Sequence, residues 1–361
     1  MPTPVDQRKQ PADRATARLP EHIFDAILLV SFGGPEGPDD VMPFLENVTR
    51  GRGVPRERLL EVAHHYERFG GVSPINSQNR ALIEALEPEL RAAGVELPVY
   101  FGNRNWRPFL GDTMRQMSDD GVRRALAVFT SAFSSYSGCR QYREDLFVAQ
   151  QAVGEDAPEV PRVRMFFNHP GFVEANVDRV RDALAQLPEG DVHIAFTAHS
   201  IPLAMAKNCA YEAQLQEASR LVAETVGVDD WSVVYQSRSG SPQVPWLEPD
   251  VSDHLEDAAA RGIRNVVISP IGFVSDHLEV LYDLDVEARE KAAELGLTMV
   301  RAGTAGTHPA FVAGLRALIV ERMTPGAERP ALGRLGPSHD ACAPDCCLAG
   351  NGRPSPWDAP D

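Results

Sequence analysis

Residues 265–287 read NVVISPIGFVSDHLEVLYDLDVE, and this stretch decides the fold because two periodicities meet within it. Residues 265–269 form a short β-branched run bounded by Pro270 and Gly272, which is typical of a strand that ends in a turn. From Leu278 onward, apolar residues recur at helical spacing. A buried strand followed by a helix is the repeating unit of an α/β protein with parallel strands.

The same unit recurs on both sides of this stretch, where short apolar runs alternate with helical patterns. The predicted strands are 26–32, 98–102, 124–130 and 163–167, followed by 192–198, 231–236, 265–269 and 297–301. We therefore predict two similar α/β domains joined near residues 168–190, each with a four-stranded parallel sheet. Ligands of open α/β sheets bind beyond the carboxyl ends of the strands, so the loops there are the candidates for chemistry.

The helix after strand 265–269 carries carboxylates along one side. On a helical wheel with Leu278 at zero, Glu279, Asp283 and Glu287 fall near about 100°, 140° and 180°, with Asp276 among them. Apolar side chains fill most of the remaining circle, which predicts a helix that is buried on most sides. Like charges four residues apart repel, and a bound cation or a protonated carboxyl would offset this repulsion. A plain acidic helix surface is the alternative interpretation.

A histidine follows another predicted strand. Residues 192–202 end in Phe-Thr-Ala-His199-Ser200-Ile201-Pro202, which places His199 at the carboxyl end of a sheet. An imidazole titrates near neutral pH, so His199 could act as a general base or a metal ligand. Alternatively, His199 only caps a helix or hydrogen-bonds polar groups of the loop. A histidine that faces a row of carboxylates would suit metal delivery and proton uptake.

Three further segments could contact a ligand. The loop Ser31-Phe32-Gly33-Gly34-Pro35-Glu36 lacks the G-x-G-x-x-G spacing, so dinucleotide binding is unsupported, but its glycines allow a flat ligand to approach the backbone. Arg50 and Arg52 could bind anionic groups, or they could form a solvated basic turn. Trp246 could stack on an aromatic ligand or simply pack.

Three of the five cysteines, Cys342, Cys346 and Cys347, are clustered near the C-terminus. The odd total argues against a secreted disulfide framework, and the spacing is typical of metal ligation. Adjacent cysteines suit a [2Fe–2S] cluster better than a zinc site, and a cluster needs a fourth ligand. That ligand is Cys139 or Cys209, unless a histidine such as His339 serves. Reduced thiols in a disordered tail are the alternative.

Composition narrows the class of protein. The chain has 361 residues, with 35 basic and 51 acidic side chains and a net charge of −16, which argues against a nucleic-acid binder. The sequence shows neither a membrane span nor a secretory signal, so we predict a cytoplasmic protein, with a monomer as the default. We predict a disordered tail over residues 1–20 and a Pro/Gly-rich tail with the clustered cysteines over residues 325–361.

Four motifs in this order resemble those of the ferrochelatase family. They are SFGGP at 31–35, YERFGGVSP at 66–74, TAHSIP at 197–202 and PIGFVSDHLE at 270–279, and the resemblance spans residues 24–320. It implies insertion of Fe²⁺ into a porphyrin with release of two protons. It also implies two Rossmann-like (chelatase) domains, 21–170 and 171–307, with a porphyrin cleft between them. A C-terminal helix at 308–324 would pack back on the first domain.

The resemblance also implies roles for individual residues. The family's catalytic pair falls on His199, which would take pyrrole protons or bind metal, and on Glu279 opposite. Asp283 and Glu287 would continue the line as a path for Fe²⁺ or protons. Saddling of the macrocycle would expose the pyrrole lone pairs. Many bacterial relatives have a tyrosine that can ligate iron at the position of Phe32, so here ligation would fall to His199 or water.

One further stretch points to a branch of the family. The sequence Ser-Tyr-Ser-Gly-Cys at 135–139 resembles cluster-bearing bacterial relatives, which favours Cys139 over Cys209 as the fourth [2Fe–2S] ligand. This type resembles the branch that metallates coproporphyrin III, whose four propionates need donors at the cleft rim. Candidate donors are Arg50, Arg52, Ser73, Tyr136 and Arg140.

Several alternatives stay open within and outside this branch. The chain could use protoporphyrin IX as its substrate, or insert another metal such as cobalt. It could instead be a non-catalytic haem or iron carrier with a redox-sensing cluster. For the enzyme, a downstream protein that handles iron coproporphyrin is a further expected partner.

Overall fold

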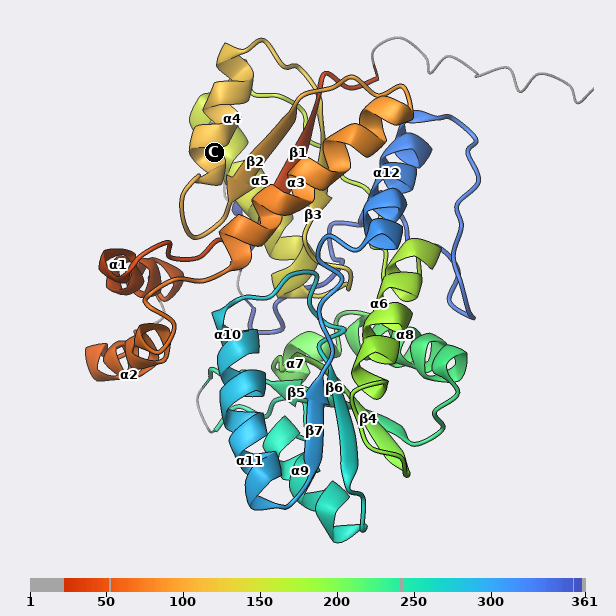
Figure 1. Cartoon of the computed structure of the whole chain (residues 1–361). Helices are drawn as coiled ribbons and strands as arrows, with labels where there is room; N and C mark the ends of the chain where they lie inside the picture. Colours follow the sequence, from red (N-terminus) through yellow and green to blue (C-terminus); the bar gives the residue numbers. More distant parts are fainter. Residues whose placement is uncertain (1–22, 52, 241–242, 353, 359–361) are drawn as a thin grey trace, which may run out of the picture.

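The computed structural model describes residues 23–51, 53–240, 243–352 and 354–358, which form two parallel sheets (Figure 1). The first has the order β2-β1-β3, with β1 (Ala26–Ser31), β2 (Val99–Asn103) and β3 (Ala125–Phe129). The second has the order β5-β4-β6-β7, with β4 (Val192–His199), β5 (Trp231–Gln236), β6 (Asn265–Ser269) and β7 (Thr298–Arg301). The α/β class with parallel strands is confirmed. The tail predicted over residues 1–20 lies outside the described residues.

The first sheet has three strands rather than four, so the strand predicted at 163–167 is wrong. The chain approaches β3 slightly earlier, where an isolated bridge joins Ala127 to Arg162. Pro161, which has no N–H to donate, interrupts pairing at this point. The apolar run that follows is buried for another reason: Phe166 packs edge-on against Phe172 and does not pair with a strand.

Helices cover both faces of the first sheet. Alternate residues of β1 point to opposite sides: Ile27 and Leu29 meet α3 (Ile75–Ala92) and α12 (Pro309–Met323), while Leu28 and Val30 meet α4 (Leu110–Asp119) and α5 (Gln141–Val153). The C-terminal helix α12 packs against α3 and against α6 (Pro170–Leu184), as Figure 1 shows.

The second sheet is covered in the same way. Helices α6 and α8 (Tyr211–Val226) lie on one face, and α9 (Val251–Ala260) and α11 (Arg289–Glu294) lie on the other. A single apolar cluster contains both Leu29 of the first sheet and Phe196 of the second, joined through α6 and α12. The two halves therefore share buried surface.

The helices α1 (Pro38–Val48) and α2 (Arg56–Glu67) form a small apolar cluster of their own, beside the sheets in Figure 1. Their Phe44, Leu59 and Tyr66 pack with Leu278, the first residue of α10 (Leu278–Val280). The short helix α7 (Leu203–Ala206) follows β4. Within the described residues, no helix has both the length and the apolar character needed to cross a membrane.

After α12 the chain has little regular structure and ends in the 3₁₀ turn η3 (Pro356–Asp358), but it is tied to the body. Arg164 is buried, forms an ion pair with Glu321 at 2.8 Å and donates to the carbonyl oxygen of Pro330. Asn168 donates to the carbonyl oxygens of Leu332 and Gly336. The segment over residues 330–336 is therefore fastened to the body by buried side chains.

Candidate functional site

His199 is the last residue of β4, and its two ring nitrogens have different partners. The Nδ1 atom hydrogen-bonds the carbonyl oxygen of Ser200. A carbonyl can only accept, so Nδ1 carries a proton, and in the neutral imidazole Nε2 is the nitrogen with the lone pair. That Nε2 lies 3.8 Å from Oε2 of Glu279, and the two side chains are 33% and 51% exposed. A ligand can therefore reach both groups.

A close crossing of two loops brings these residues together. After β6 the chain passes over the end of β4, where the N–H of Gly272 donates to the carbonyl oxygen of Thr197 at 3.0 Å. A Cβ at position 272 would lie 2.6 Å from the Cβ of Ala198, so only glycine permits this approach. The crossing aims the chain so that Glu279 faces His199.

The helix that carries the carboxylates begins later than predicted and changes type. It starts at Leu278 as α10 and continues as the π-helix η2 (Leu281–Ala288), a form that occurs frequently at functional sites. Asp276 therefore precedes the helix, and its predicted position on the wheel is wrong. Its carboxylate instead pairs with Arg301 at 3.0 Å. The expected burial is present on two sides, where Val280 and Leu278 enter different apolar clusters.

The predicted line of carboxylates has an unusual member in Asp283. Burial, together with the nearby charges of Glu279 and Glu287, raises the pKa of this carboxyl to about 7. Hydrogen bonds from Ser237 and from Gln236, the latter at 3.2 Å, oppose this shift. The pKa of Glu287 is also raised, chiefly by burial. Asp283 can thus take up and release a proton near neutral pH.

Two residues beside Glu279 lie in motifs quoted from the sequence, yet we assigned them no role. His277 has its Nδ1 3.9 Å from Oε2 of Glu279, and burial lowers the pKa of its imidazole. Tyr66 is buried in the α1–α2 cluster, and both burial and the charge of Glu279 raise the pKa of its hydroxyl. Their places in YERFGGVSP and DHLE were the available signal.

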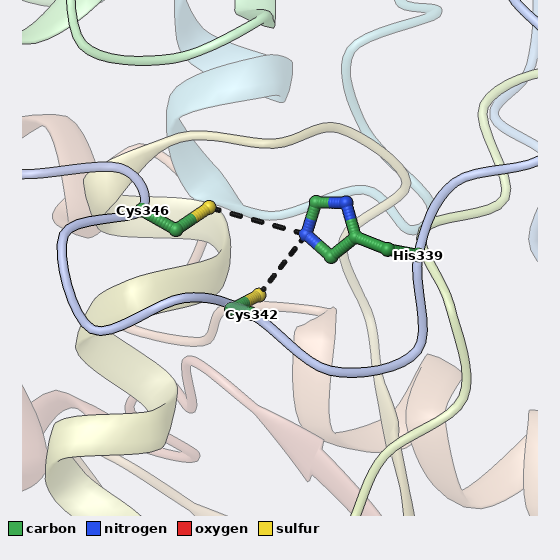
Figure 2. A group of neighbouring side chains, drawn as sticks. All are labelled: His339, Cys342 and Cys346. Atoms are coloured by element: carbon green, nitrogen blue, oxygen red, sulfur yellow. Dashed lines mark hydrogen bonds between the residues drawn. The ribbon is translucent and has the colours of Figure 1, made fainter.

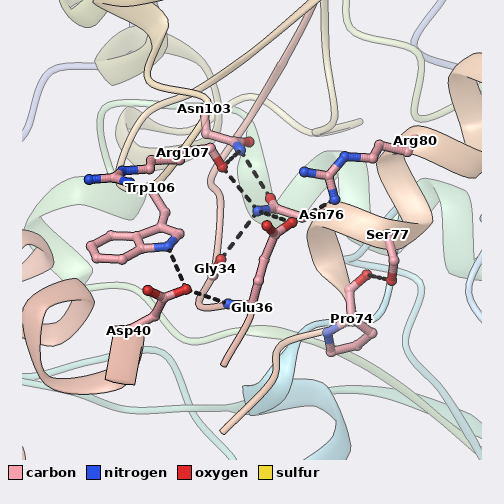
Figure 3. A network of polar contacts seen from close by, with 10 residues as sticks. All are labelled: Gly34, Glu36, Asp40, Pro74, Asn76, Ser77, Arg80, Asn103, Trp106 and Arg107. Atoms are coloured by element: carbon pink, nitrogen blue, oxygen red, sulfur yellow. Dashed lines mark hydrogen bonds and ion pairs between the residues drawn. The ribbon is translucent and has the colours of Figure 1, made fainter. Parts of the chain in front are cut away.

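The loop after β1 is held rigidly, as Figure 3 shows. The Nδ2 atom of Asn76 donates to the carbonyl oxygen of Gly34 at 3.2 Å, and Asn103 donates to Oδ1 of Asn76 at 3.0 Å. Gly33 has a φ of 81°, and a Cβ there would lie 2.8 Å from that of Asn103. The sequence motif indicated the two glycines, but not the buried Asn76 and Asn103 that hold the loop in place.

The candidate ligand contacts on the first half lie in different settings. Phe32 is 37% exposed, and the guanidinium of Arg104 lies 5.7 Å from its ring centre. Ser73 is buried and donates its N–H to the carbonyl oxygen of Pro35. Arg50 is exposed just after α1, and Arg52 lies outside the described residues.

Three other candidates already have structural partners. Tyr136 and Arg140, in the π-helical turn η1 (Tyr136–Arg140), are buried and both bind the carboxylate of Glu144 at 2.9 Å. Arg140 also donates to the C-terminal segment. Trp246 packs on Gly240, where a Cβ would lie 2.3 Å from the indole ring. Tyr136 and Arg140 are buried in packing contacts, whereas Trp246 is half-buried, and contact of the three with a ligand stays a prediction.

The C-terminal cysteines gather with a histidine (Figure 2). One ligand atom from each of His339, Cys342 and Cys346 lies within 4.8 Å of the other two, and Cys347 Sγ is 3.5 Å from that of Cys346. Cys139 is a buried residue of η1, and its thiol hydrogen-bonds Cys342. We name this set, Cys139, His339, Cys342, Cys346 and Cys347, the thiol group.

Electrostatics within the thiol group favour one thiolate. The hydrogen bond from Cys139 lowers the pKa of Cys342, burial opposes this, and Arg162 lowers the pKa further. The same hydrogen bond and burial raise the pKa of Cys139. Cys209 lies beside the thiol group, just after α7, and its thiol donates to the carbonyl oxygens of Met205 and Ala206 in that helix. Burial and, to a smaller extent, the charge of Cys346 raise the pKa of Cys209.

Comparison with known proteins gives consistent matches. A family model described as Ferrochelatase matches residues 24–323. A ferrochelatase of Rhodopirellula baltica is 58% identical over 334 residues, covering 92% of this chain and 95% of that protein. The coproporphyrin III ferrochelatase of Streptomyces coelicolor is 54% identical over 359 residues, with the same coverages, and that of Mycolicibacterium smegmatis is 57% identical over 294 residues, covering 80% and 86%.

Solved structures share the fold. The structure of SirB from Bacillus subtilis with Fe³⁺ superposes with a TM-score of 0.52 at 12% identity, covering 82% of this chain and 94% of that one. At this identity the likeness supports the chelatase fold alone.

The raised pKa of Asp283 predicts a pH-dependent stability. Because the folded protein favours the protonated acid, the stabilisation is complete below the ordinary pKa of 3.8 and is lost as pH rises through about 7. Asp283→Asn should therefore gain stability relative to the wild type above pH 7, by at most about 4 kcal/mol. Urea unfolding at pH 5 and pH 8 measures this difference.

The exposed Asp112→Asn is the matched control, and its stability difference should not change between the two pH values. If the difference in unfolding free energy between the wild type and Asp283→Asn is the same at pH 5 and pH 8, the pKa of Asp283 is not raised.

Proposed function

Because the chain belongs to the ferrochelatase family, we propose that it inserts Fe²⁺ into coproporphyrin III and releases two protons, as a lyase of haem biosynthesis. The observation that carries this proposal is the free Nε2 of His199, which faces the Glu279 carboxylate at 3.8 Å. An imidazole base beside a carboxylate matches a reaction that exchanges two pyrrole protons for a dication, because the first can accept a proton and the second can bind the metal ion.

His199 acts as the proton acceptor. Since Nδ1 donates its proton to the carbonyl oxygen of Ser200, Nε2 is the nitrogen that can accept a proton from the substrate. The imidazolium that results is stabilised by Glu279. Oxygen and imidazole donors bind Fe²⁺ readily but do not sharply exclude Co²⁺ or Zn²⁺.

Asp283 and Glu287 continue this path away from His199. A carboxyl with a pKa of about 7 can be protonated or ionised at working pH, so Asp283 can exchange protons or share a cation with its neighbours. The raised pKa of Glu287 supports the same role at the next position. The line from Glu279 to Glu287 thus serves as a path for metal ions and protons.

We assign the porphyrin to the space between the two halves, with domain limits near residues 170 and 307. Phe32 packs against one face of the macrocycle and, lacking a ligand atom, leaves axial ligation to His199 or water. Arg50, Arg52 and Ser73 are the rim donors of the proposal. The name of the Streptomyces coelicolor relative supports coproporphyrin III, whose four propionates need more such donors than protoporphyrin IX.

We further propose that Cys139, Cys342, Cys346 and Cys347 hold a [2Fe–2S] cluster, which supplies one-electron redox chemistry when bound. The donor set supports this: four thiols lie together, one pair hydrogen-bonded and another 3.5 Å apart. His339 is the alternative ligand, since its Nε2 is 3.4 Å from Cys342. Cys209 is the other alternative.

The substrate assignment predicts a preference between two porphyrins. In an anaerobic assay with Fe²⁺, the purified chain should metallate coproporphyrin III at least about tenfold faster than protoporphyrin IX, measured as kcat/KM. The faster use of protoporphyrin IX would overturn the substrate but leave the chemistry intact. Tight binding of both without turnover would favour a carrier.

The role of His199 predicts a loss of chemistry without a loss of binding. His199→Ala should lower kcat at least about 100-fold, because a general base contributes that much or more. Quenching of porphyrin fluorescence should still report binding. His64→Ala, an exposed histidine paired with Glu67 on α2, is the control and should keep its activity. Wild-type turnover by His199→Ala would refute the assignment.

The ligand set predicts the colour of the protein. Cys139→Ser should lose the visible absorbance of the cluster, whereas Cys209→Ser should keep it. The opposite result would move the fourth ligand to Cys209. Loss of the absorbance in His339→Ala together with its retention in Cys139→Ser would assign the histidine.

A further inference from the structure

Arg162 is a buried cation that neither the fold nor the proposed reaction explains. It lies beside β3 and is only 5% exposed. Its guanidinium has two recorded hydrogen bonds: Nη1 donates to the carbonyl oxygen of Val163 at 2.7 Å, and Nη2 donates to Sγ of Cys342 at 3.0 Å. The side chain therefore ends in the thiol group.

Two other buried arginines of the same region show what Arg162 lacks. Arg140 has the carboxylate of Glu144 at 2.9 Å, and Arg164 has that of Glu321 at 2.8 Å. Among the residues that the structure describes, no ion pair links Arg162 to a carboxylate. Its side-chain partner is instead a sulfur atom.

A buried guanidinium without a counter-charge is costly, because it has lost its hydration and gained no anion. The groups that can provide a negative charge here are the thiols of Cys139, Cys342 and Cys346, whose charges act on Arg162. Arginine cannot relieve the cost by losing its proton. The guanidinium therefore needs an anionic partner, and the sulfur atom of Cys342, 3.0 Å away, belongs to the group that can supply one.

We infer that Arg162 is the counter-ion of the thiol group and raises the reduction potential of the cluster held there, through the N–H···S bond to Cys342 and its positive charge. This inference rests on the [2Fe–2S] cluster proposed above. Arg162 is a positioning residue, since it contacts a cluster ligand and not the porphyrin.

The direction of the effect follows from charge. One-electron reduction adds a negative charge to the cluster, and a nearby cation and a hydrogen bond to its sulfur ligand stabilise that added charge. Removing the cation should make reduction harder. Lysine would restore the charge, but its single ammonium lacks the planar fork that reaches both Val163 and Cys342.

The test is an anaerobic redox titration of the full chain against dithionite, followed by visible absorbance, after reconstitution with Fe²⁺ and sulfide. Arg162→Gln should favour the oxidised cluster at least about tenfold, a fall of about 59 mV for a one-electron couple. Arg162→Lys should fall between it and the wild type. Arg124→Gln, which removes an arginine paired with Glu159, is the matched control and should leave the potential unchanged.

The outcomes separate this inference from the proposal beneath it. A wild type that stays colourless after reconstitution refutes the cluster, and the inference with it. A coloured Arg162→Gln with the wild-type potential refutes the inference alone. If circular dichroism shows that Arg162→Gln is folded but the variant does not keep the cluster, the Arg162→Lys variant decides whether the positive charge is what the cluster needs. A coloured lysine variant supports the counter-ion role, and a folded, colourless one refutes it.

Discussion

The parallel pairing of β4 with β6 is the constraint on which the site depends. In that register Phe196 lies opposite Ser269, so β6 ends three residues before β4, and the loops that follow them leave the same edge of the sheet. His199 continues β4 by three residues, while the chain after β6 must turn at once across it. The contact of Gly272 with Ala198 closes that turn. The distance between His199 and Glu279 is thus set by backbone hydrogen bonds, which are more rigid than side-chain contacts alone.

A second constraint is electrostatic, because Glu279, Asp283 and Glu287 lie along the same helical segment and, among the described residues, no ion pair joins any of the three to a lysine or arginine. Arg301 forms ion pairs with Asp276, before the helix, and with Asp285, within it. Its charge therefore does not neutralise the line formed by Glu279, Asp283 and Glu287. The proton that Asp283 retains up to about pH 7 relieves repulsion inside that line. The same property that lets the helix fold therefore lets it exchange protons. A neutral helix would be more stable at high pH but could not form the proposed path for protons.

The sequence was sufficient for those features that depend on local pattern. Seven of the eight predicted strands are present, because a β-branched run between turns is a local signal. The eighth failed because burial of Phe166 comes from packing against a helix, which gives the same apolar pattern as a strand. The change from α10 to the π-helix η2 was invisible, since both forms use the same residues. Strand position and helical spacing singled out His199 and Glu279, and the family resemblance paired them as catalytic. The family match confirms the resemblance but not their roles.

The C-terminal segment shows why distant partners escape sequence reasoning. Arg140, Arg162 and Arg164 lie far before it in the chain, yet each donates to it, at Cys346, Cys342 and Pro330 respectively. Sequence patterning could identify the tail as rich in Pro and Gly, but not as a segment that is held by buried cations. Arg140 and Arg164 are already paired with carboxylates, so they can hold the C-terminal segment without a negative charge on that segment. Arg162 has no carboxylate partner among the described residues, and it donates to Cys342 instead. The same contact therefore holds the C-terminal segment and places a positive charge beside the thiol group.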